Sequence, residues 1–337
     1  MLNIITIGAL VLSAYFLRSD LADTLNNLEQ VNSWIILLLI PIEALNYHAQ
    51  AKLYQGMFTI VGNKLPYKFL LRASIELNFI NHVFPSGGAA GISYFGLRMR
   101  SGEISAAKAT LMHVMKLALT FLSFEVVLVF GMLCLAAMGR VNNLTILVGT
   151  AISTLLLVCT ALFAHVVGSK TRINQFFTAA TRFLNRLIHV VRPKHPETIN
   201  VSRAREVFDD FHDNYRQLRQ DLPQLKGPFW YALLANITEV LAVYAVFFAF
   251  GEVVNLGAVI LAYGVANFAG LISVLPGGIG VYEFLMTAVL TTAGVPVGVS
   301  IPVIIMYRVV NTLIQVPLGY VLYQRYLAAG GKKVTAE

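Results

Sequence analysis

Two basic side chains stand deep inside apolar stretches of this sequence, where a charge is costly. Arg308 lies about eleven residues into the stretch that begins at Val297, and Lys116 about ten residues into the one that begins at Ala106. At roughly 1.5 Å of rise per residue, both would lie about 15 to 16 Å along a helix, near the middle of a bilayer core about 30 Å thick. A charge at that depth normally persists for a partner or a ligand. Each cation is therefore either a candidate anion site or one half of a buried ion pair that fixes helix packing.

Polar residues accompany both cations at helical spacing. His113 and Thr120 lie three residues before and four residues after Lys116, so all three would share one helix face. Asn311 and Gln315 follow the arginine by three and seven residues and would share its face in the same way. His113 could carry a proton, or it could be a buried polar residue with a satisfied hydrogen bond. We include this histidine and Asn311 in the candidate binding site.

Three carboxylates are candidates to neutralise these cations. Glu43 and Glu239 lie near the middle of two further apolar stretches, and Glu283 begins a helix shortly after a run of glycines. A carboxylate in that last position is also favoured by the helix dipole alone. We expect the three to pair with the cations in the resting state, since unpaired charges inside a membrane are expensive. In the purely structural alternative, Glu239 or Glu283 is the permanent partner of Arg308.

Proline and glycine interrupt two of the apolar stretches. The breaks are residues 85–88, with the sequence PSGG, and residues 276–280, with the sequence PGGIG. Backbone opened in this way at membrane depth is tolerated only where protein buries it or where it lines a wet cavity. The amides of Gly277, Gly278 and Gly280 could therefore face an anion such as a lipid phosphate at the start of a half-helix. The alternative is that these glycines only allow a tight turn and close packing.

Arg98 and Arg100 follow the first break, on the side that basic connections assign to the cytoplasm. They could attract anionic lipid headgroups, or they could simply follow the positive-inside rule. We count Arg98 as a further candidate site residue.

Composition identifies the class of protein. Of 337 residues, 57% are hydrophobic and 12% are charged, and apolar runs of spanning length recur along the chain. These values predict an integral membrane protein and exclude a water-soluble one. The formal net charge of +8 lies in the connections between apolar runs, so it reports orientation and not nucleic-acid binding. The sequence has no metal-ligand cluster, no cofactor motif and no nucleophile with an adjacent base, so we expect neither a cofactor nor an enzyme.

The apolar runs predict an all-α polytopic membrane protein with about six spanning helices and two Pro/Gly-broken re-entrant segments. The expected spanning helices are about 2–17, 31–47, 106–138, 144–167, 229–250 and 297–322. The first is expected to be retained, since it lacks the basic leader of a cleaved signal. Basic residues between 48 and 72 return the chain to the cytoplasm after the second helix, and both termini are expected there. The second break could instead separate two half-spans.

Four segments follow from this topology. Residues 1–167 hold the first membrane repeat and the start of the second, 168–228 form a cytoplasmic linker, 229–327 complete the second repeat, and 328–337 form a cytoplasmic tail. Within the linker, residues 168–226 carry eleven Lys or Arg against six Asp or Glu. Basic and apolar residues alternate there in a way that predicts an amphipathic helix on the membrane surface. A solvated helical linker is the alternative.

The two halves of the chain share a register. Lys116 follows Pro85 by 31 residues, and Arg308 follows Pro276 by 32. The expected topology makes the first three spanning helices run opposite to the last three. Inverted repeats with Gly/Pro-interrupted segments in corresponding positions are typical of alternating-access transporters, whose substrate site lies where the repeats meet.

These motifs resemble those of a known family, the membrane region of lysylphosphatidylglycerol synthases and their stand-alone, flippase-like relatives. The resemblance covers about residues 1–325 and rests on three sets of residues: 275–280 with Glu283, 85–88 with Arg98, and Tyr307 with Arg308. It implies a multi-spanning lipid translocator, since in the synthases this region is similar to a flippase of aminoacylated phospholipid. The soluble aminoacyl-transfer domain of the synthases has no counterpart in this sequence, so lipid aminoacylation is not expected.

The leading hypothesis is therefore a flippase-like translocator in the cell (inner) membrane. It would move an anionic phospholipid or a polyprenyl-phosphate lipid between leaflets by alternating access, with membrane lipids as its partners. The first alternative is an integral membrane enzyme that modifies a lipid headgroup. The second is a transporter of small polar solutes, which would need a pocket without lateral openings to lipid.

Overall fold

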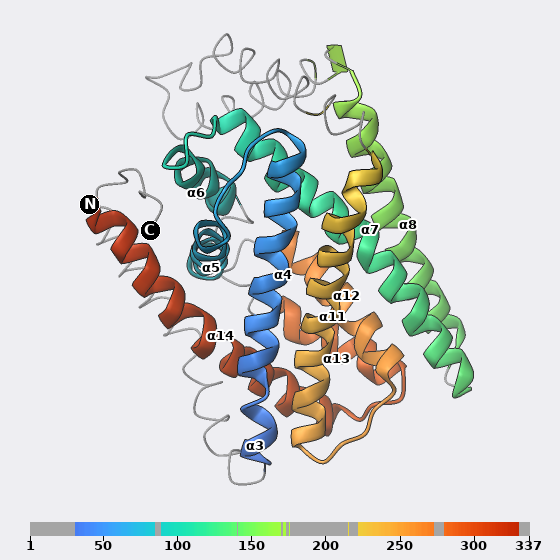
Figure 1. The fold of residues 1–337 in the computed structure, drawn as a ribbon. Coiled ribbons are helices and arrows are strands. Elements are labelled where there is room, and N and C mark those ends of the chain that lie inside the picture. Colours follow the sequence, from blue (N-terminus) through green and yellow to red (C-terminus); the bar gives the residue numbers. More distant parts are fainter. Residues whose placement is uncertain are drawn as a thin grey trace, which may run out of the picture.

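The computed structural model describes residues 31–84, 89–139, 141–169, 171, 172, 175, 215, 222–272 and 280–329. These residues form helices joined by short connections, and no strand occurs among them (Figure 1). The prediction of an all-α membrane protein is confirmed. The helices are α3 (Ser33–Ile36), α4 (Leu39–Ile60), α5 (Tyr67–Val83), α6 (Ala89–Arg100), α7 (Ala106–Ala137), α8 (Asn143–Val167), a 3₁₀ turn (Leu222–Leu225), α11 (Lys226–Ala249), α12 (Leu256–Ile272), α13 (Val281–Thr292) and α14 (Val297–Ala328).

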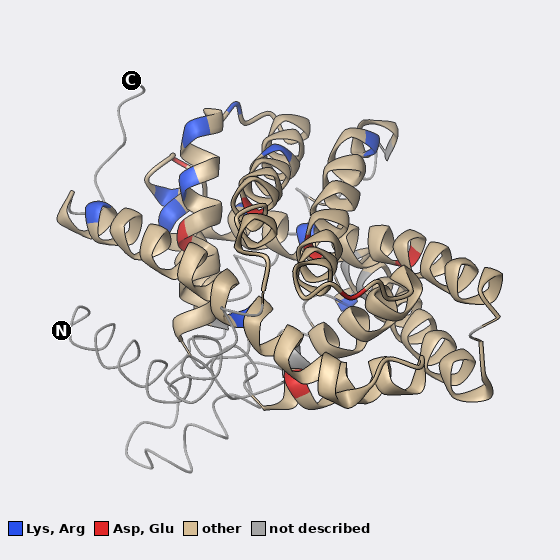
Figure 2. Ribbon diagram, turned by 90° about the horizontal axis from the view of Figure 1, so that it is seen from below, with Lys and Arg blue, Asp and Glu red and all other residues tan. Residues whose placement is uncertain are grey.

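Four of the described helices are long and apolar enough to cross a membrane: α7, α8, α11 with the turn before it, and α14. Large apolar side chains on these helices are exposed, among them Phe130, Leu147 and Leu318, as contact with lipid requires. Figure 2 shows that charged residues are sparse along the described helices. The predicted first spanning helix, residues 2–17, lies outside the described residues, so the count of about six stays a prediction.

Helix α4 differs from the sequence prediction. It extends to Ile60, whereas we expected the second spanning helix to end at about residue 47, so His48 and Lys52 lie within the helix and not in the connection after it. Its buried face carries Asn46 and Gln50, whose side chains bind partners on α11 and α7. In the sequence these polar residues interrupt the apolar run, which is why we expected the helix to end there. In the structure tertiary hydrogen bonds satisfy their side chains, so the helix continues.

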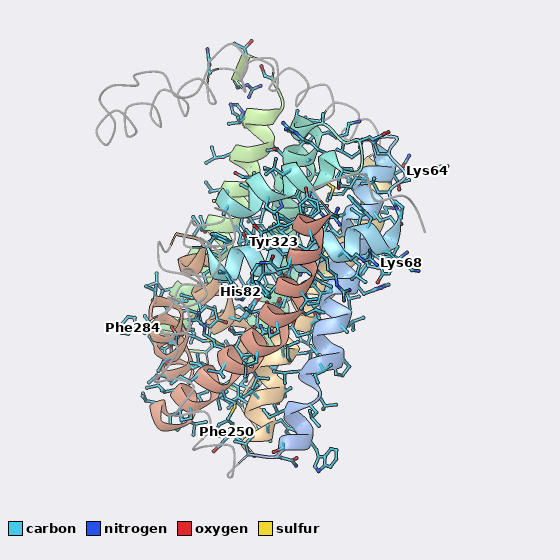
Figure 3. The ribbon with its side chains drawn as sticks, turned by 90° about the vertical axis from the view of Figure 1, so that its left-hand side faces the viewer. Lys64, Lys68, His82, Phe250, Phe284 and Tyr323 are labelled. Atoms are coloured by element: carbon cyan, nitrogen blue, oxygen red, sulfur yellow. The ribbon has the colours of Figure 1, made fainter. Side chains whose placement is uncertain are left out.

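The helix bundle has two ends, which Lys64 and Phe250 mark in Figure 3. At the Phe250 end, the carbonyl of Ala249 in α11 accepts the backbone N–H that precedes α3 (2.9 Å). At the Lys64 end, the ammonium of Lys108 in the first turn of α7 donates to the side-chain oxygen of Asn63, just after α4 (2.9 Å). Helices α4 and α7 therefore start at opposite ends of the bundle.

Helices α5 and α6 form a pair that starts and finishes at the Lys64 end. The guanidinium of Arg98, near the end of α6, lies 4.5 Å from the ring centroid of Phe69, near the start of α5. The break predicted between the two helices, residues 85–88, lies outside the described residues.

Helices α12 and α13 form a second pair, which starts and finishes at the Phe250 end. Asn255, just before α12, donates its side-chain N–H to the carbonyl of Cys134 near the end of α7 (3.2 Å). Asn142, just before α8, donates to the carbonyl of Thr292 at the end of α13 (2.8 Å). The two pairs therefore enter the bundle from opposite ends. That each is re-entrant in a membrane, and that they derive from an inverted repeat, stay predictions.

Two helix crossings depend on glycine. A Cβ atom on Gly319 of α14 would clash with the side chain of Phe79 in α5 and would lie 3.1 Å from the carbonyl oxygen of Ile75. A Cβ atom on Gly257 of α12 would clash with the carbonyl oxygen of Gly131 in α7. Both helix pairs are thus held against long helices at backbone contact distance.

Candidate functional site

A cavity of about 390 Å³ lies in the interior of the bundle, between the two helix pairs. Helices α4, α5, α7, α11, α12, α13 and α14 all contribute to its wall. Its charged residues are Lys116, Glu239 and Arg308, and His82 joins them from the end of α5, between the two ends of the bundle (Figure 3). Side-chain amides supply most of the other polar groups: Asn46, Gln50, Asn78, Asn81, Asn236, Asn267, Asn311 and Gln315.

Arg308 reaches the cavity from α14 and forms an ion pair with Glu283 of α13. Its guanidinium lies 5.1 Å from the ring centroid of Tyr282, so a cation–π contact adds to the ion pair. Glu283 also accepts the backbone N–H of Gly280 (2.7 Å) and thereby caps the start of α13. The φ angle of Gly280 is 86°, which residues with a Cβ atom rarely adopt. The arginine side chain remains 13% exposed, so its charge is accessible from the cavity.

Lys116 projects from α7 and donates a hydrogen bond to the side-chain oxygen of Gln50 (2.6 Å). Because an ammonium group can only donate, the N–H of the Gln50 amide must point onward, and it donates to the side-chain oxygen of Asn46 (2.6 Å). The N–H of Asn46 in turn donates to Glu239 (3.2 Å). Two aligned amides therefore connect the ammonium with the carboxylate. Lys116 and Glu239 compensate each other without direct contact.

A second chain of hydrogen bonds reaches Glu239 along one face of α14. Tyr307, Asn311 and Gln315 are four residues apart, so their side chains lie one above another. Gln315 donates to Asn311 (2.8 Å), and Asn311 donates to the hydroxyl of Tyr307 (3.3 Å). That hydroxyl donates to Glu239 (3.2 Å). Gln315 also donates to Glu43 of α4 (3.0 Å). This chain of hydrogen bonds, which we call the α14 ladder, joins the buried Glu43 to Glu239 at the cavity wall.

The structure brings several of the residues predicted from sequence together. Four of them line the cavity: Arg308, Lys116, Glu239 and Asn311. Glu283 contacts the cavity site through its ion pair with the arginine. Gly280 lies at the start of α13, whereas Gly277 and Gly278 lie outside the described residues.

Two further predicted residues lie away from the cavity. His113 is buried, and its Nδ1 atom lies 2.8 Å from the hydroxyl of Tyr54. Arg98 is buried as well and forms an ion pair with Glu76 (2.7 Å). An arginine side chain that is only 3% exposed is not available to lipid headgroups at the membrane surface.

The expected resting-state pairing of carboxylates with cations is formed between Arg308 and Glu283. It was wrong for Glu43 and Glu239, since neither lies within ion-pair distance of a cation in the part of the chain that the structure describes. The helices instead place amide and phenol donors next to these carboxylates. Neutral hydrogen bonds therefore replace the direct ion pairs.

Sequence reasoning missed the amides that connect the charges. Asn46 follows Glu43 within the second apolar stretch, and Gln50 lies three residues after its expected end. A polar residue inside such a stretch is a signal for a buried site in its own right. It also missed His82, whose Nδ1 donates to the carbonyl of Asn78 (2.9 Å) because a carbonyl oxygen can only accept. Among the described residues, no three His, Cys, Asp or Glu side chains are grouped as metal ligands.

An apolar cleft of about 170 Å³ adjoins the cavity. The two spaces share wall residues from α7, α11 and α12, including Thr120, Asn236 and Asn267. Beyond these, the cleft is lined by Phe121, Phe124, Leu156, Gly264 and Phe268. A polar cavity beside an apolar cleft suits an amphipathic ligand, with a polar headgroup and a hydrocarbon chain.

Comparison with known proteins places the chain in a family. The sequence model described as the lysylphosphatidylglycerol synthase TM region matches residues 2–319. A UPF0104 membrane protein of Methanothermobacter thermautotrophicus is 33% identical over 98 residues, which is 29% of each chain, so the match spans less than a third of that relative. A UPF0104 membrane protein of Pyrococcus horikoshii is 23% identical over 252 residues, or 72% of each chain. The protein is thus a multi-pass membrane protein that belongs to the family of the lysylphosphatidylglycerol synthase transmembrane region.

Proposed function

We propose that this protein translocates an anionic lipid, either a phospholipid or a polyprenyl phosphate, between the leaflets of the cell (inner) membrane. The observation that carries the proposal is the polar cavity that presents Arg308 and Lys116 beside an apolar cleft. A phosphate fits the two cations, and a hydrocarbon chain fits the cleft. The family supports a membrane function related to lipids, since its name refers to a phospholipid. The proposed activity is transport, without covalent chemistry on the lipid.

Binding would proceed by exchange of partners at the two cations. Arg308 is neutralised by Glu283, which an incoming phosphate can replace, since a guanidinium can bind phosphate through two parallel hydrogen bonds. Lys116 is held by the neutral amide of Gln50, so a phosphate would displace a weaker partner there. A charged headgroup would in this way cross the apolar interior without a net unpaired charge.

Access to the cavity would alternate between the two sides of the membrane. The α5–α6 pair enters the bundle from the Lys64 end, and the α12–α13 pair enters from the Phe250 end. Rocking of one pair against the other would open the cavity first to one leaflet and then to the other, as in transporters built from inverted repeats. We place the Lys64 end and both termini in the cytoplasm, on the positive-inside rule.

The experiment is a leaflet-exchange assay with the purified protein in lipid vesicles. It compares the parent protein, Arg308→Gln, Arg308→Lys and empty vesicles, with a fluorescent anionic phospholipid in one series and a polyprenyl phosphate in another. Leu313→Ala is the matched control, because Leu313 is on the same helix and is 58% exposed on its outer face. The two lipid series distinguish the two candidate substrates.

We expect Arg308→Gln to lower the exchange rate about tenfold or more, since a hydrogen bond to a charged group contributes roughly 1.5–3 kcal/mol. Arg308→Lys should retain part of the activity, because the charge survives without the planar fork. Leu313→Ala should match the parent. If Arg308→Gln exchanges both lipids as fast as a parent protein that is clearly above empty vesicles, the arginine is a structural ion-pair partner and the proposal is wrong.

A further inference from the structure

Glu43 is the carboxylate of this site that has no charged partner. It is 2% exposed on α4, and its hydrogen bond from the Gln315 amide (3.0 Å) comes from a neutral group. Two other carboxylates of the bundle are compensated. Glu76 pairs with Arg98, and Glu239 receives donors at both oxygens and connects through two amides with Lys116. An ionised Glu43 would be a buried charge with one neutral hydrogen bond, which is a costly state.

One buried acceptor atom next to Glu43 has no donor. The side-chain oxygen of Gln315 is buried without a hydrogen-bond partner among the described residues. A carboxylic acid has an O–H that a carboxylate lacks. Protonation of Glu43 would therefore supply the donor that this oxygen needs, after the Gln315 amide turns over to present it.

Reversal of the Gln315 amide would change the direction of the other hydrogen bonds in the α14 ladder. With the Gln315 oxygen facing Glu43, the amide of Asn311 would have to reverse too, so that its N–H donates to Gln315 and its oxygen accepts the hydroxyl of Tyr307. The hydroxyl would then no longer donate to Glu239. Proton binding at one end of the ladder would thus remove a hydrogen bond from the carboxylate at the cavity wall.

We propose that Glu43 is a proton-binding site and that the α14 ladder transmits its protonation to Glu239 in the cavity. The ligand is a proton and not a metal cation, because the described residues do not group three His, Cys, Asp or Glu side chains at this site. Proton binding at this site does not depend on the proposed function. Coupling of the proton to lipid movement does rest on the proposed function.

Other titratable groups face this region from each neighbouring helix. They are Glu239 of α11, Lys116 of α7, His82 of α5, Tyr263 of α12, Tyr307 and Arg308 of α14, and Tyr47 of α4 itself. Each of them can titrate or shift the charge around Glu43. The test must therefore assign the proton to one side chain.

Infrared difference spectroscopy of the purified protein in lipid vesicles makes that assignment. We expect the parent protein to show the carbonyl band of a buried carboxylic acid, shifted in D₂O, which disappears as the pH is raised. Glu43→Gln should remove the band, and Glu239→Gln should leave it in place. In a Gln315→Leu background, Glu239→Gln should move the midpoint of the band's titration less than it does in the parent. Thermal unfolding of each variant confirms that it is folded.

The proton site is contradicted if the band persists in folded Glu43→Gln, if the parent has no such band, or if sodium removes the band and choline does not, since sodium would then be the ligand. An equal shift of the midpoint with and without Gln315 would contradict the ladder.

A second measurement tests coupling in the leaflet-exchange assay. We expect the exchange rate of the parent to depend on pH or on an imposed pH gradient, and Glu43→Gln to lose that dependence. Exchange by the parent that is independent of pH overturns the coupling while the proposed function stands. Absence of exchange by the parent overturns the proposed function, and the infrared result then decides the proton site alone.

Discussion

At the scale of single residues, the cavity balances its charges through neutral groups. Lys116 and Glu239 are joined by the amides of Gln50 and Asn46. Each amide accepts a hydrogen bond on its oxygen from the ammonium side and donates its N–H toward the carboxylate. Such an arrangement keeps both charges inside the bundle while leaving the cation with only neutral contacts. A ligand phosphate can then reach the ammonium without breaking a direct ion pair.

This compensation predicts a non-additive pair of substitutions. Lys116→Met should lower the free energy of unfolding by roughly 3 kcal/mol, because it leaves the Glu239 carboxylate buried without its counter-charge. The double variant Lys116→Met/Glu239→Gln should recover most of that loss. Unfolding of the detergent-solubilised proteins measures both, with Lys64→Met as an exposed control. A double variant whose loss equals the sum of the losses of Lys116→Met and Glu239→Gln would show that the two charges are independent.

The buried ion pair of Arg98 with Glu76 predicts that substitution of this arginine affects folding and not transport. Its guanidinium is buried against the rings of Phe69 and Tyr326 and pairs with Glu76. Arg98→Gln should therefore destabilise the protein by about 3 kcal/mol or more. Arg100→Gln, at an exposed position two residues away, should change stability by less than about 0.5 kcal/mol. Equal stabilities of the two variants would contradict the buried ion pair.

Charges could be located from the sequence, but their connections could not. Arg308 and Lys116 stand out because a cation in an apolar stretch is rare. Which carboxylate meets which cation depends on how helices far apart in sequence pack, as with Arg308 and Glu283. Side-chain amides such as Gln50 give a weaker signal, since an uncharged polar residue is tolerated in many places.

At the scale of elements, the helix pairs are positioned by close backbone contacts that glycine permits. Gly319→Ala should destabilise the protein, because its Cβ atom would clash with Phe79 and crowd the carbonyl of Ile75, so α5 and α14 must separate. Gly298→Ala is the matched control in the same helix: nothing lies within 4 Å of its Cβ position. That change should stabilise α14 by up to about 1 kcal/mol. Thermal unfolding should thus show shifts of opposite sign, and two stabilising shifts would contradict the crossing.

Long apolar helices were predicted from sequence to within a few residues, as for 106–138 against α7 and 144–167 against α8. The polar helix α4 was predicted too short, because its polar residues are satisfied by partners that only the fold supplies. The proline and glycine of the second break indicated an interruption, but not that α12 and α13 begin and end beside the same end of α7 and α8. Local sequence indicates where a helix ends, and tertiary contacts determine its position and direction in the bundle.

At the scale of the whole molecule, the two tryptophans lie about one bilayer-core thickness apart along the bundle. Trp230 lies near the start of α11 and is 65% exposed. Trp34, 81% exposed, lies two residues after the backbone N–H that binds Ala249, at the other end of α11. Trp230 and Ala249 are nineteen positions apart, which corresponds to roughly 28 Å of helix, close to the thickness of a bilayer core. Tryptophan is enriched at both membrane interfaces, so the bundle axis lies across the membrane.

The positive-inside rule predicts which end of the bundle faces outward. In a background with Cys134→Ala and Cys159→Ala, a membrane-impermeant maleimide added to intact cells should label Glu252→Cys and not Lys64→Cys. Both positions are exposed, so permeabilised cells should be labelled at either one. The reverse pattern in intact cells would invert the proposed orientation.

The central claim is that the cations of the cavity hold an anionic lipid, and the most direct measurement is the identity of the lipid that the protein retains. The protein is purified gently, and mass spectrometry compares lipids bound to the parent, to Arg308→Gln/Lys116→Gln and to the exposed control Leu313→Ala. We predict that the parent and the control retain an anionic phospholipid or a polyprenyl phosphate, and that the double variant loses it. Retention of the same lipid in equal amount by all three proteins, or of neutral lipids alone by the parent, would contradict the account.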